Sequence, residues 1–260
     1  MHRLTWFKLV LIVLPISLTC LLLAAIFSLI LVPTFAEIWE SLLSKEMLFS
    51  LKLTVWTSLL STFLVFLVSV PTGYSLSRID FWGKSIVKTI IDLPIAFPEL
   101  VLGLCLLLLF GKPEIQKILG AAGLDFVFTK QGIVVAQFFT ALPYSVRIIK
   151  STFDYINPRL EFVSRSLGYS MFETFLKVSL PLAKSGLLAA TIIAFARSIG
   201  TFGTVLILAG GSYMQTEILP ITLYLNISYG NMPMAITSGI ILVIVSFIAI
   251  LVFEKSEASI

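Results

Sequence analysis

The chain has 260 residues, of which 58% are apolar and only 12% are charged, and its mean hydropathy is +1.05. This composition excludes a water-soluble globular domain and indicates a polytopic membrane protein. The net charge of +4 reflects how cations are distributed between loops, so it does not indicate nucleic-acid binding.

Six apolar runs are each long enough to cross a bilayer as a helix, which takes roughly 20 residues. They cover residues 9–32, 53–76, 86–110, 132–149, 182–208 and 234–253. The first run follows Arg3 and Lys8, as in a signal peptide, but it is longer than the usual apolar core of about 7–15 residues. We therefore expect a retained first helix and one all-α transmembrane domain over residues 1–260.

Lys and Arg residues concentrate in alternate loops, which sets the orientation of a multi-pass protein. With the N-terminus inside, twelve cations lie inside: Arg3, Lys8, Arg78, Lys84, Lys88, Arg147, Lys150, Arg159, Arg165, Lys177, Lys184 and Lys255. Five lie outside: Lys45, Lys52, Lys112, Lys117 and Lys130. The sequence predicts a cell-membrane protein with six spans and both termini in the cytoplasm.

Metal and nucleotide sites are not expected in this chain. Its single histidine is His2, and Cys20 and Cys105 lie within apolar runs, so the usual ligand sets for zinc or haem are missing. Residues 83–85 read Gly-Lys-Ser like the end of a phosphate-binding loop, but Arg78 stands where that loop needs a glycine. We expect no cofactor bound by this chain.

The segment 157–181, between the fourth and fifth runs, carries start and stop signals for two short helices. Asn157 can cap the first helix, and Pro158 suits its first position. Gly168 suits a left-handed residue just past the end of that helix. Ser170 and Glu173 then form a capping box for the second helix.

The second helix of this segment shows one apolar stripe at helical spacing. Its members are Met171, Phe172, Phe175, Leu176 and Val178. Glu173, Thr174 and Lys177 lie away from the stripe. Such a face can be buried in the inner leaflet, as in an interfacial helix, or against a protein partner, and the pattern alone leaves both open.

This segment resembles the cytoplasmic signature of permease subunits of ATP-binding-cassette (ABC) importers, which runs Glu-Ala-Ala, three residues, Gly, nine residues and Ile-x-Leu-Pro. Gly168 is followed after nine residues by Val-Ser-Leu-Pro at 178–181. Phe162, Val163 and Ser164 occupy the Glu-Ala-Ala positions, and Glu161 stands one place earlier.

The resemblance extends over residues 54–211, where the sequence is similar to the branch of importers for molybdate, tungstate or sulfate. It rests on Pro-Thr-Gly-Tyr-Ser-Leu-Ser-Arg at 71–78, Phe-Trp-Gly-Lys at 81–84, Asp-Leu-Pro-Ile-Ala-Phe-Pro at 92–98, Ser-Leu-Gly at 166–168 and Phe-Ala-Arg-Ser-Ile-Gly-Thr-Phe-Gly at 195–203. Two positions depart from the branch, which often has an acid at Thr201 and seldom has one at Glu99.

The resemblance implies a homodimer of six-span subunits, with two ATPase subunits on the cytoplasmic side and a substrate-binding protein outside. ATP and Mg would be bound by the ATPase, so this chain would not be an enzyme. The segment 157–181 would be the coupling loop, contacting the ATPase through Glu161, Phe162, Val163, Ser164, Arg165, Ser166, Leu167, Gly168, Tyr169, Met171 and Phe172. The expected external loop 211–233, with Tyr213, Tyr224 and Tyr229, would dock the binding protein.

The implied cargo is a tetrahedral oxyanion, molybdate or tungstate, with sulfate or thiosulfate as the alternative. From a different class, an ion-gradient secondary transporter would show internal repeats and several buried carboxylates. An intramembrane enzyme would need a nucleophile with a base, or paired acids. Neither pattern is found in this sequence.

Two ionisable residues are expected at mid-depth in the membrane, Glu99 in the third run and Arg197 in the fifth. Arg197 could offer a positive site to a divalent oxyanion, or it could form a neutral structural pair with Glu99. We favour the pair, because a strong anion site would retain the cargo that an importer must release. Thr201, Gly200 and Gly203 complete the expected pathway or gate, since small residues allow close approach of another helix.

Overall fold

The computed structural model describes residues 2–258, and its regular structure there is helical. The helices of the first half are α1 (His2–Leu31), α2 (Phe35–Leu43), α3 (Lys45–Arg78), α4 (Lys84–Ala96), α5 (Glu99–Phe110), α6 (Pro113–Ala121) and α7 (Lys130–Tyr155). Those of the second half are α8 (Pro158–Ser166), α9 (Met171–Thr174), the π-helix η1 (Phe175–Ser179), α10 (Leu180–Leu182), α11 (Lys184–Gly200), α12 (Gly203–Leu208), α13 (Leu219–Tyr229) and α14 (Met232–Ala258).

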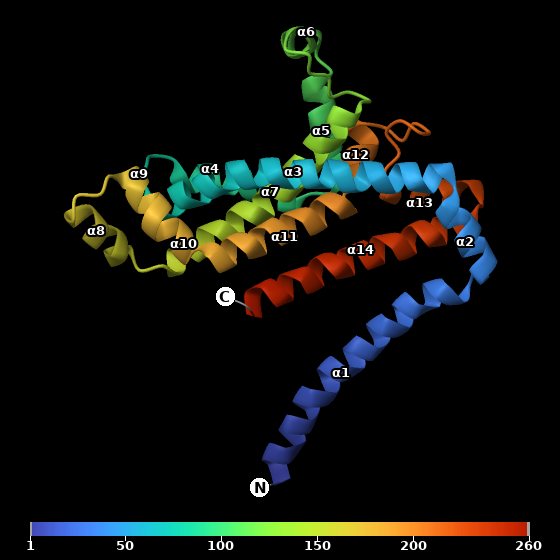
Figure 1. The fold of residues 1–260 in the computed structure, drawn as a ribbon, viewed down its shortest axis with the longest axis horizontal. Helices are drawn as coiled ribbons and strands as arrows, with labels where there is room; N and C mark the ends of the chain where they lie inside the picture. Colours follow the sequence, from blue (N-terminus) through green and yellow to red (C-terminus); the bar gives the residue numbers. More distant parts are fainter. Residues whose placement is uncertain (1, 259–260) are drawn as a thin grey trace.

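The centre of the molecule is a bundle in which α3, α7 and α11 pack side by side, with α14 alongside α11 (Figure 1). Small polar residues line the contact between α3 and α7: Ser69 Oγ lies 2.8 Å from Ser145 Oγ, and Gln137 Nε2 donates to Ser58 Oγ at 3.2 Å. Small side chains let helix backbones approach closely where lipid removes the hydrophobic drive to associate. These contacts hold the bundle at a defined register.

Four helices have the length and composition of membrane spans: Trp6–Leu29, Lys45–Arg78, Lys130–Tyr155 and Met232–Val252. Two further pairs of helices qualify only together. The chain bends by 116° between Lys84–Ala96 and Glu99–Phe110. It bends by 76° between Met171–Leu182 and Lys184–Gly200. The described residues therefore hold four spans, or up to six if each bent pair counts as one.

The third and fifth apolar runs do not form continuous helices. The run 86–110 breaks between α4 and α5, where Phe97 is extended with φ −115° and ψ 158°. Pro98 follows it, and the ring of a proline disfavours the helical conformation in the residue before it. The run 182–208 breaks at Thr201 and Phe202, between α11 and α12.

The expected external loop 211–233 contains a helix that belongs to the core. Leu219 and Ile221 of α13 are fully buried, and Leu219 N donates to Thr54 Oγ1 of α3 at 2.8 Å. Tyr213 and Tyr229 remain exposed. The segment thus divides into a structural helix and an exposed part at the same end of the bundle.

The helices α8–α10 lie at one end of the bundle, here called the loop end, and α2 and α13 lie at the other (Figure 1). Helix α1 departs from the bundle and contacts it at α14, and none of the residues Trp6–Leu29 is fully buried. The bundle therefore places the loop 157–181 beyond the ends of α3, α7 and α11.

Candidate functional site

The two short helices at the loop end begin and end where their sequence signals predicted. Asn157 Oδ1 accepts a hydrogen bond from Arg159 N at 3.0 Å, and Gly168 has a φ of +95°. Ser170 Oγ accepts from Glu173 N at 3.2 Å, while Glu173 Oε2 accepts from Ser170 N at 2.9 Å. These local caps define the shape of the loop before any tertiary contact is made.

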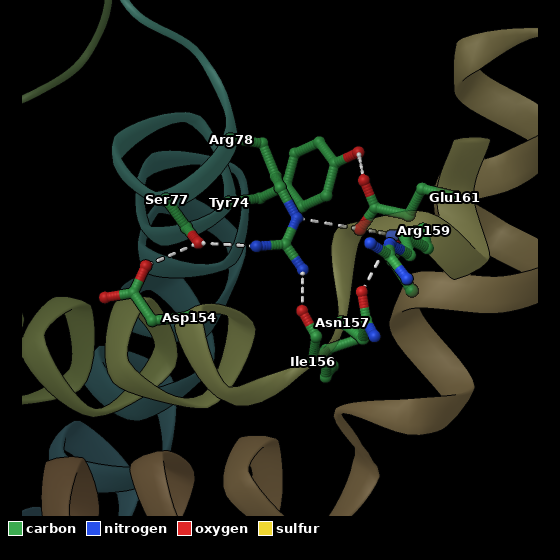
Figure 2. Close-up of polar contacts among 9 residues, drawn as sticks. Tyr74, Ser77, Arg78, Asp154, Ile156, Asn157, Arg159 and Glu161 are labelled. Carbon is green, nitrogen blue, oxygen red and sulfur yellow. Dashed lines mark hydrogen bonds and ion pairs between the residues drawn. The ribbon is translucent and has the colours of Figure 1, made fainter.

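Glu161 is the buried anchor of this loop, and its carboxylate pairs with Arg78 at the end of α3 (Figure 2). Arg78 Nε donates to Glu161 Oε1 at 3.0 Å, and both side chains are at most 10% exposed. Tyr74 Oη donates to Oε2 at 3.3 Å, and Ser179 Oγ donates to Oε1 at 2.8 Å. Removing one partner of such a buried pair costs roughly 3–5 kcal/mol, because it leaves an uncompensated charge.

The same arginine ties the loop to α7 (Figure 2). Arg78 Nη2 donates to the carbonyl oxygen of Ile156 at 2.7 Å, just past the end of α7. Arg78 Nη1 donates to Ser77 Oγ, which in turn donates to Asp154 Oδ1 at 2.7 Å. One guanidinium thus links α3, the end of α7 and α8.

An aromatic cluster supports this anchor from beneath. The Tyr74 ring lies 5.1 Å from the Phe153 ring of α7 and 4.8 Å from the Phe175 ring of η1, both in edge-to-face arrangements. Ser164 Oγ lies 3.1 Å from Thr174 Oγ1, which joins α8 to α9. A displacement of the loop would have to break this packing or carry α3 and α7 with it.

The outer face of the loop is apolar and uncovered. Of the residues expected to contact a partner, Glu161 and Ser164 point inward and are buried. The others are exposed: Phe162, Val163, Arg165, Ser166, Leu167, Gly168, Tyr169, Met171 and Phe172. Leu167 is 76% and Phe172 is 68% exposed, so an exposed apolar surface lies over the buried anchor.

The predicted single stripe on the second helix was wrong. Thr174 is buried, although it was placed away from the stripe, whereas Leu176 is 44% exposed. Thr174 turns inward to Ser164, with the two hydroxyl oxygens 3.1 Å apart, and the wider turn of the π-helix Phe175–Ser179 rotates the residues after Phe175 relative to an α-helix. The inward face is therefore partly polar, and Met171, Phe172 and Leu176 look outward.

The ion pair expected between Glu99 and Arg197 is not formed. Glu99 Oε2 accepts hydrogen bonds from the backbone N–H groups of Phe202 and Gly203, at 3.2 and 3.1 Å, where α12 begins. Arg197 is exposed and lies over the ring of Tyr144 of α7, with Cζ 4.1 Å from the ring centroid. Glu99 is thus satisfied by backbone donors, and Arg197 by a cation–π contact.

The position of Arg197 identifies a face of the bundle that lipid does not cover. Tyr144 precedes the end of α7 at Tyr155 by eleven residues, or about 16 Å of helix, which is close to half of a bilayer core. An exposed guanidinium at that depth is costly in hydrocarbon, and such residues face water-filled cavities or protein. The face that carries Tyr144 and Arg197 therefore borders an aqueous space or another chain.

Comparison with known proteins shows the family to which this chain belongs. A family model described as "Binding-protein-dependent transport system inner membrane component" matches residues 69–258, which include the loop, its anchor and Arg197. The chain belongs to that permease family. The permease is 33% identical over 215 residues to the molybdate/tungstate transport system permease protein WtpB of Methanocaldococcus jannaschii, covering 82% of this chain and 83% of that protein.

A second relative has a different printed cargo. The permease is 28% identical over 222 residues to the sulfate transport system permease protein CysT of Escherichia coli, covering 85% of this chain and 79% of that protein. It is thus an ABC importer permease subunit of the molybdate, tungstate and sulfate branch. Its relatives are permease subunits, which are not enzymes themselves, since the ATPase activity lies in a partner subunit.

Solved structures show the same fold. The permease matches a chain of a bacterial ABC transporter involved in the import of the acidic polysaccharide alginate, with a TM-score of 0.77, 16% identity and coverage of 98% of this chain and 96% of that one. The methionine ABC transporter MetNI matches with a TM-score of 0.63, 20% identity and coverage of 84% and 99%. At these identities the likeness concerns the fold.

The remaining expected pathway residues of the permease have unequal surroundings. Thr201 is buried, and its Oγ1 donates to the carbonyl oxygen of Arg197 at 2.7 Å. A Cβ on Gly203 would lie 3.1 Å from Glu99 Cβ, so α12 and α5 approach closely there. A Cβ on Gly200 would meet nothing within 4 Å, and Gly200 borders an apolar groove that Phe202 and residues of α13 and α14 also line.

Proposed function

We propose that this chain forms the membrane pathway of an ATP-driven importer that carries a tetrahedral oxyanion, molybdate or tungstate, into the cell. The observation that carries the proposal is the loop end: an exposed apolar face lies directly over the buried Glu161–Arg78 pair. A loop of this construction can transmit a rigid-body movement from a soluble partner to α3 and α7. The resemblance of the surrounding sequence to permeases of the branch supports the same role.

The orientation that fits this role has the loop end in the cytoplasm of a cell with an inner or cytoplasmic membrane. The cation count supports it, since Arg78, Arg159 and Arg165 all lie at the loop end. Both termini then lie inside, and α2, α6 and α13 lie toward the outside. The exposed Tyr213 and Tyr229 belong to the surface that would meet a substrate-binding protein.

The assembly that completes the importer contains two copies of this chain and two ATPase subunits, with ATP and Mg held by the ATPase. Two surfaces support a second copy. The exposed Arg197 face needs protein or water opposite it, and none of the residues Trp6–Leu29 of the apolar helix α1 is fully buried within its own chain. A solved alginate importer contains a periplasmic binding protein, which supports the external partner.

The cargo assignment rests on charge and on relatives. Since Arg197 is not neutralised by Glu99, it offers a positive group to a divalent oxyanion at mid-depth. Sulfate or thiosulfate is the alternative cargo, and the similarity to CysT supports it equally. A protein of this family is driven by its partner ATPase, so the ion-gradient alternative is set aside.

The test is a matched pair of substitutions in the permease co-expressed with its ATPase. We expect Leu167→Glu, on the exposed face of the loop, to abolish co-purification of the ATPase and ATP-driven uptake of molybdate into vesicles. Ile118→Glu, on the equally exposed α6, which projects from the bundle away from the loop end (Figure 1), should leave both unchanged. Equal recovery of the ATPase with both variants would contradict a coupling role for this loop.

A further inference from the structure

A small cavity lies at the loop end between α3, α4 and α7, with a volume of about 160 Å³. Leu76, Lys88, Ile91, Asp92, Val146, Arg147, Lys150, Ser151 and Asp154 line it. One water molecule occupies about 30 Å³ of the liquid, so the cavity has room for a small hydrated ion. Three cations and two carboxylates leave its wall with a net charge of +1.

The cations of this cavity are only partly neutralised. Arg147 reaches Asp92 through one long contact, Nη2 to Oδ2 at 3.5 Å, and its side chain is 63% exposed. Lys150 pairs with Asp154, whose other oxygen accepts from Ser77. Lys88 makes no ion pair with any of the residues that the structure describes. Arg147 and Lys88 therefore keep donors free for an anion.

One face of α7 leads from the cavity toward the mid-depth cation. Tyr144, Arg147 and Ser151 are spaced three and four residues apart, so they share that face, and Arg197 lies over Tyr144. From Tyr144 to Ser151 the helix rises by about 10 Å. An anion leaving Arg197 would meet Arg147, which lines the cavity, about one turn further along α7.

We propose that this cavity is a release site, a second binding site for a divalent tetrahedral oxyanion on the cytoplasmic side of Arg197. The proposal rests on the proposed oxyanion transport. Arg147 would bind two oxygens of the anion through its planar fork, and Lys88 would neutralise the remaining charge. Asp92 and Asp154 compete for the same cations, which keeps the site weak enough to release its ligand.

The carboxylates distinguish this site from a storage or receptor site. A pocket built for tight anion binding would exclude like charge, because a carboxylate next to a dianion raises its energy. Here Asp92 can take Arg147 back when the anion departs. Exchange of one guanidinium between a carboxylate and an oxyanion therefore provides the release step without a conformational change in the cavity.

The experiment measures equilibrium binding of radiolabelled molybdate and sulfate to the complex of permease and ATPase, without binding protein or nucleotide, in nanodiscs of phosphatidylcholine. We expect saturable weak binding to the wild type and about tenfold weaker binding to Arg147→Gln and to Lys88→Gln. Arg147→Lys should restore part of the affinity. Lys117 is an exposed lysine of α6 that forms no ion pair within the part of the chain that the structure describes, and Lys117→Gln should bind like the wild type.

ATP-driven uptake by the complete importer separates the failure of this proposal from the failure of the proposed function. If the wild type takes up oxyanion, and Arg147→Gln matches it in both oxyanion binding and uptake, the release site is overturned and the transport function stands. Absence of uptake of molybdate, tungstate and sulfate by the wild type would overturn both. A lipid headgroup is the other possible anion. If phosphatidylglycerol in the nanodisc abolishes oxyanion binding, and molybdate does not change how much of this lipid the complex retains, the cavity holds an anionic lipid headgroup and the release site is overturned.

Discussion

Glu217 is a carboxyl group that the fold buries without a full set of partners. It lies in the loop between α12 and α13, is 2% exposed, and its Oε2 accepts no hydrogen bond from the described residues. Burial, followed by the nearby charge of Glu46, raises the pKa of Glu217 from 4.5 to about 7. Between pH 4.5 and about 7, the folded state therefore keeps a proton on Glu217 that the unfolded state has released.

A pH-dependent stability follows from this residue. The pKa of Glu217 is higher in the folded state than in the unfolded state, so the folded protein binds this proton more tightly. The stability that the proton contributes is fully present below pH 4.5 and is lost as the pH rises through 7. We expect Glu217→Gln, which is neutral at every pH, to melt several degrees higher than the wild type at pH 8 and to show a smaller difference at pH 5.5. Thermal unfolding of the purified protein in detergent measures this, and parallel pH profiles would exclude the assignment.

At the scale of elements, the crossing of α7 and α11 depends on one glycine. A Cβ on Gly186 would lie 2.0 Å from Thr152 Oγ1 and 2.7 Å from Thr152 Cβ, so the helices could not keep their present separation. We expect Gly186→Ala to destabilise the protein by roughly 1–3 kcal/mol, the usual cost of overpacking. Gly200→Ala is the matched control, since its Cβ would meet nothing within 4 Å, and equal melting temperatures for the two variants would contradict this crossing geometry.

At the scale of the whole molecule, the bundle has one face for lipid and another that lipid cannot cover. Ile248 of α14 and Ile193 of α11 are both exposed in the isolated chain, but only Ile193 lies one helical turn from the charged Arg197 on the same helix. We expect a hydrophilic thiol reagent to label Ile193→Cys in native membranes and to leave Ile248→Cys unlabelled, in a background with Cys20 and Cys105 replaced by serine. Labelling of both positions, or of Ile248→Cys alone, would show that the Arg197 face is not the aqueous one.

Local patterns determined much of this structure in advance. The centres of five of the six apolar runs fall in helices, whereas the centre of the third lies at the break at Pro98, and Asn157, Gly168 and the Ser170–Glu173 box act where the sequence placed them. Hydropathy and capping depend on residues within about one helical turn of each other, so they can be read without knowing the fold. The family membership could be predicted from the same segment, because its signature is a local spacing.

The partners of the charged groups were decided only by the tertiary structure. Glu161 meets Arg78 across 83 positions, and Arg197 meets Tyr144 instead of the expected Glu99. The helix direction changes at Phe97, after Gly200 and at the π-helix that begins at Phe175. Each change rotates the residues that follow, so their side chains contact neighbours other than those a continuous helix would give them. Apolar burial is nonspecific and can be predicted from composition, whereas an ion pair requires two groups within a few ångströms, and only the packed bundle sets that distance.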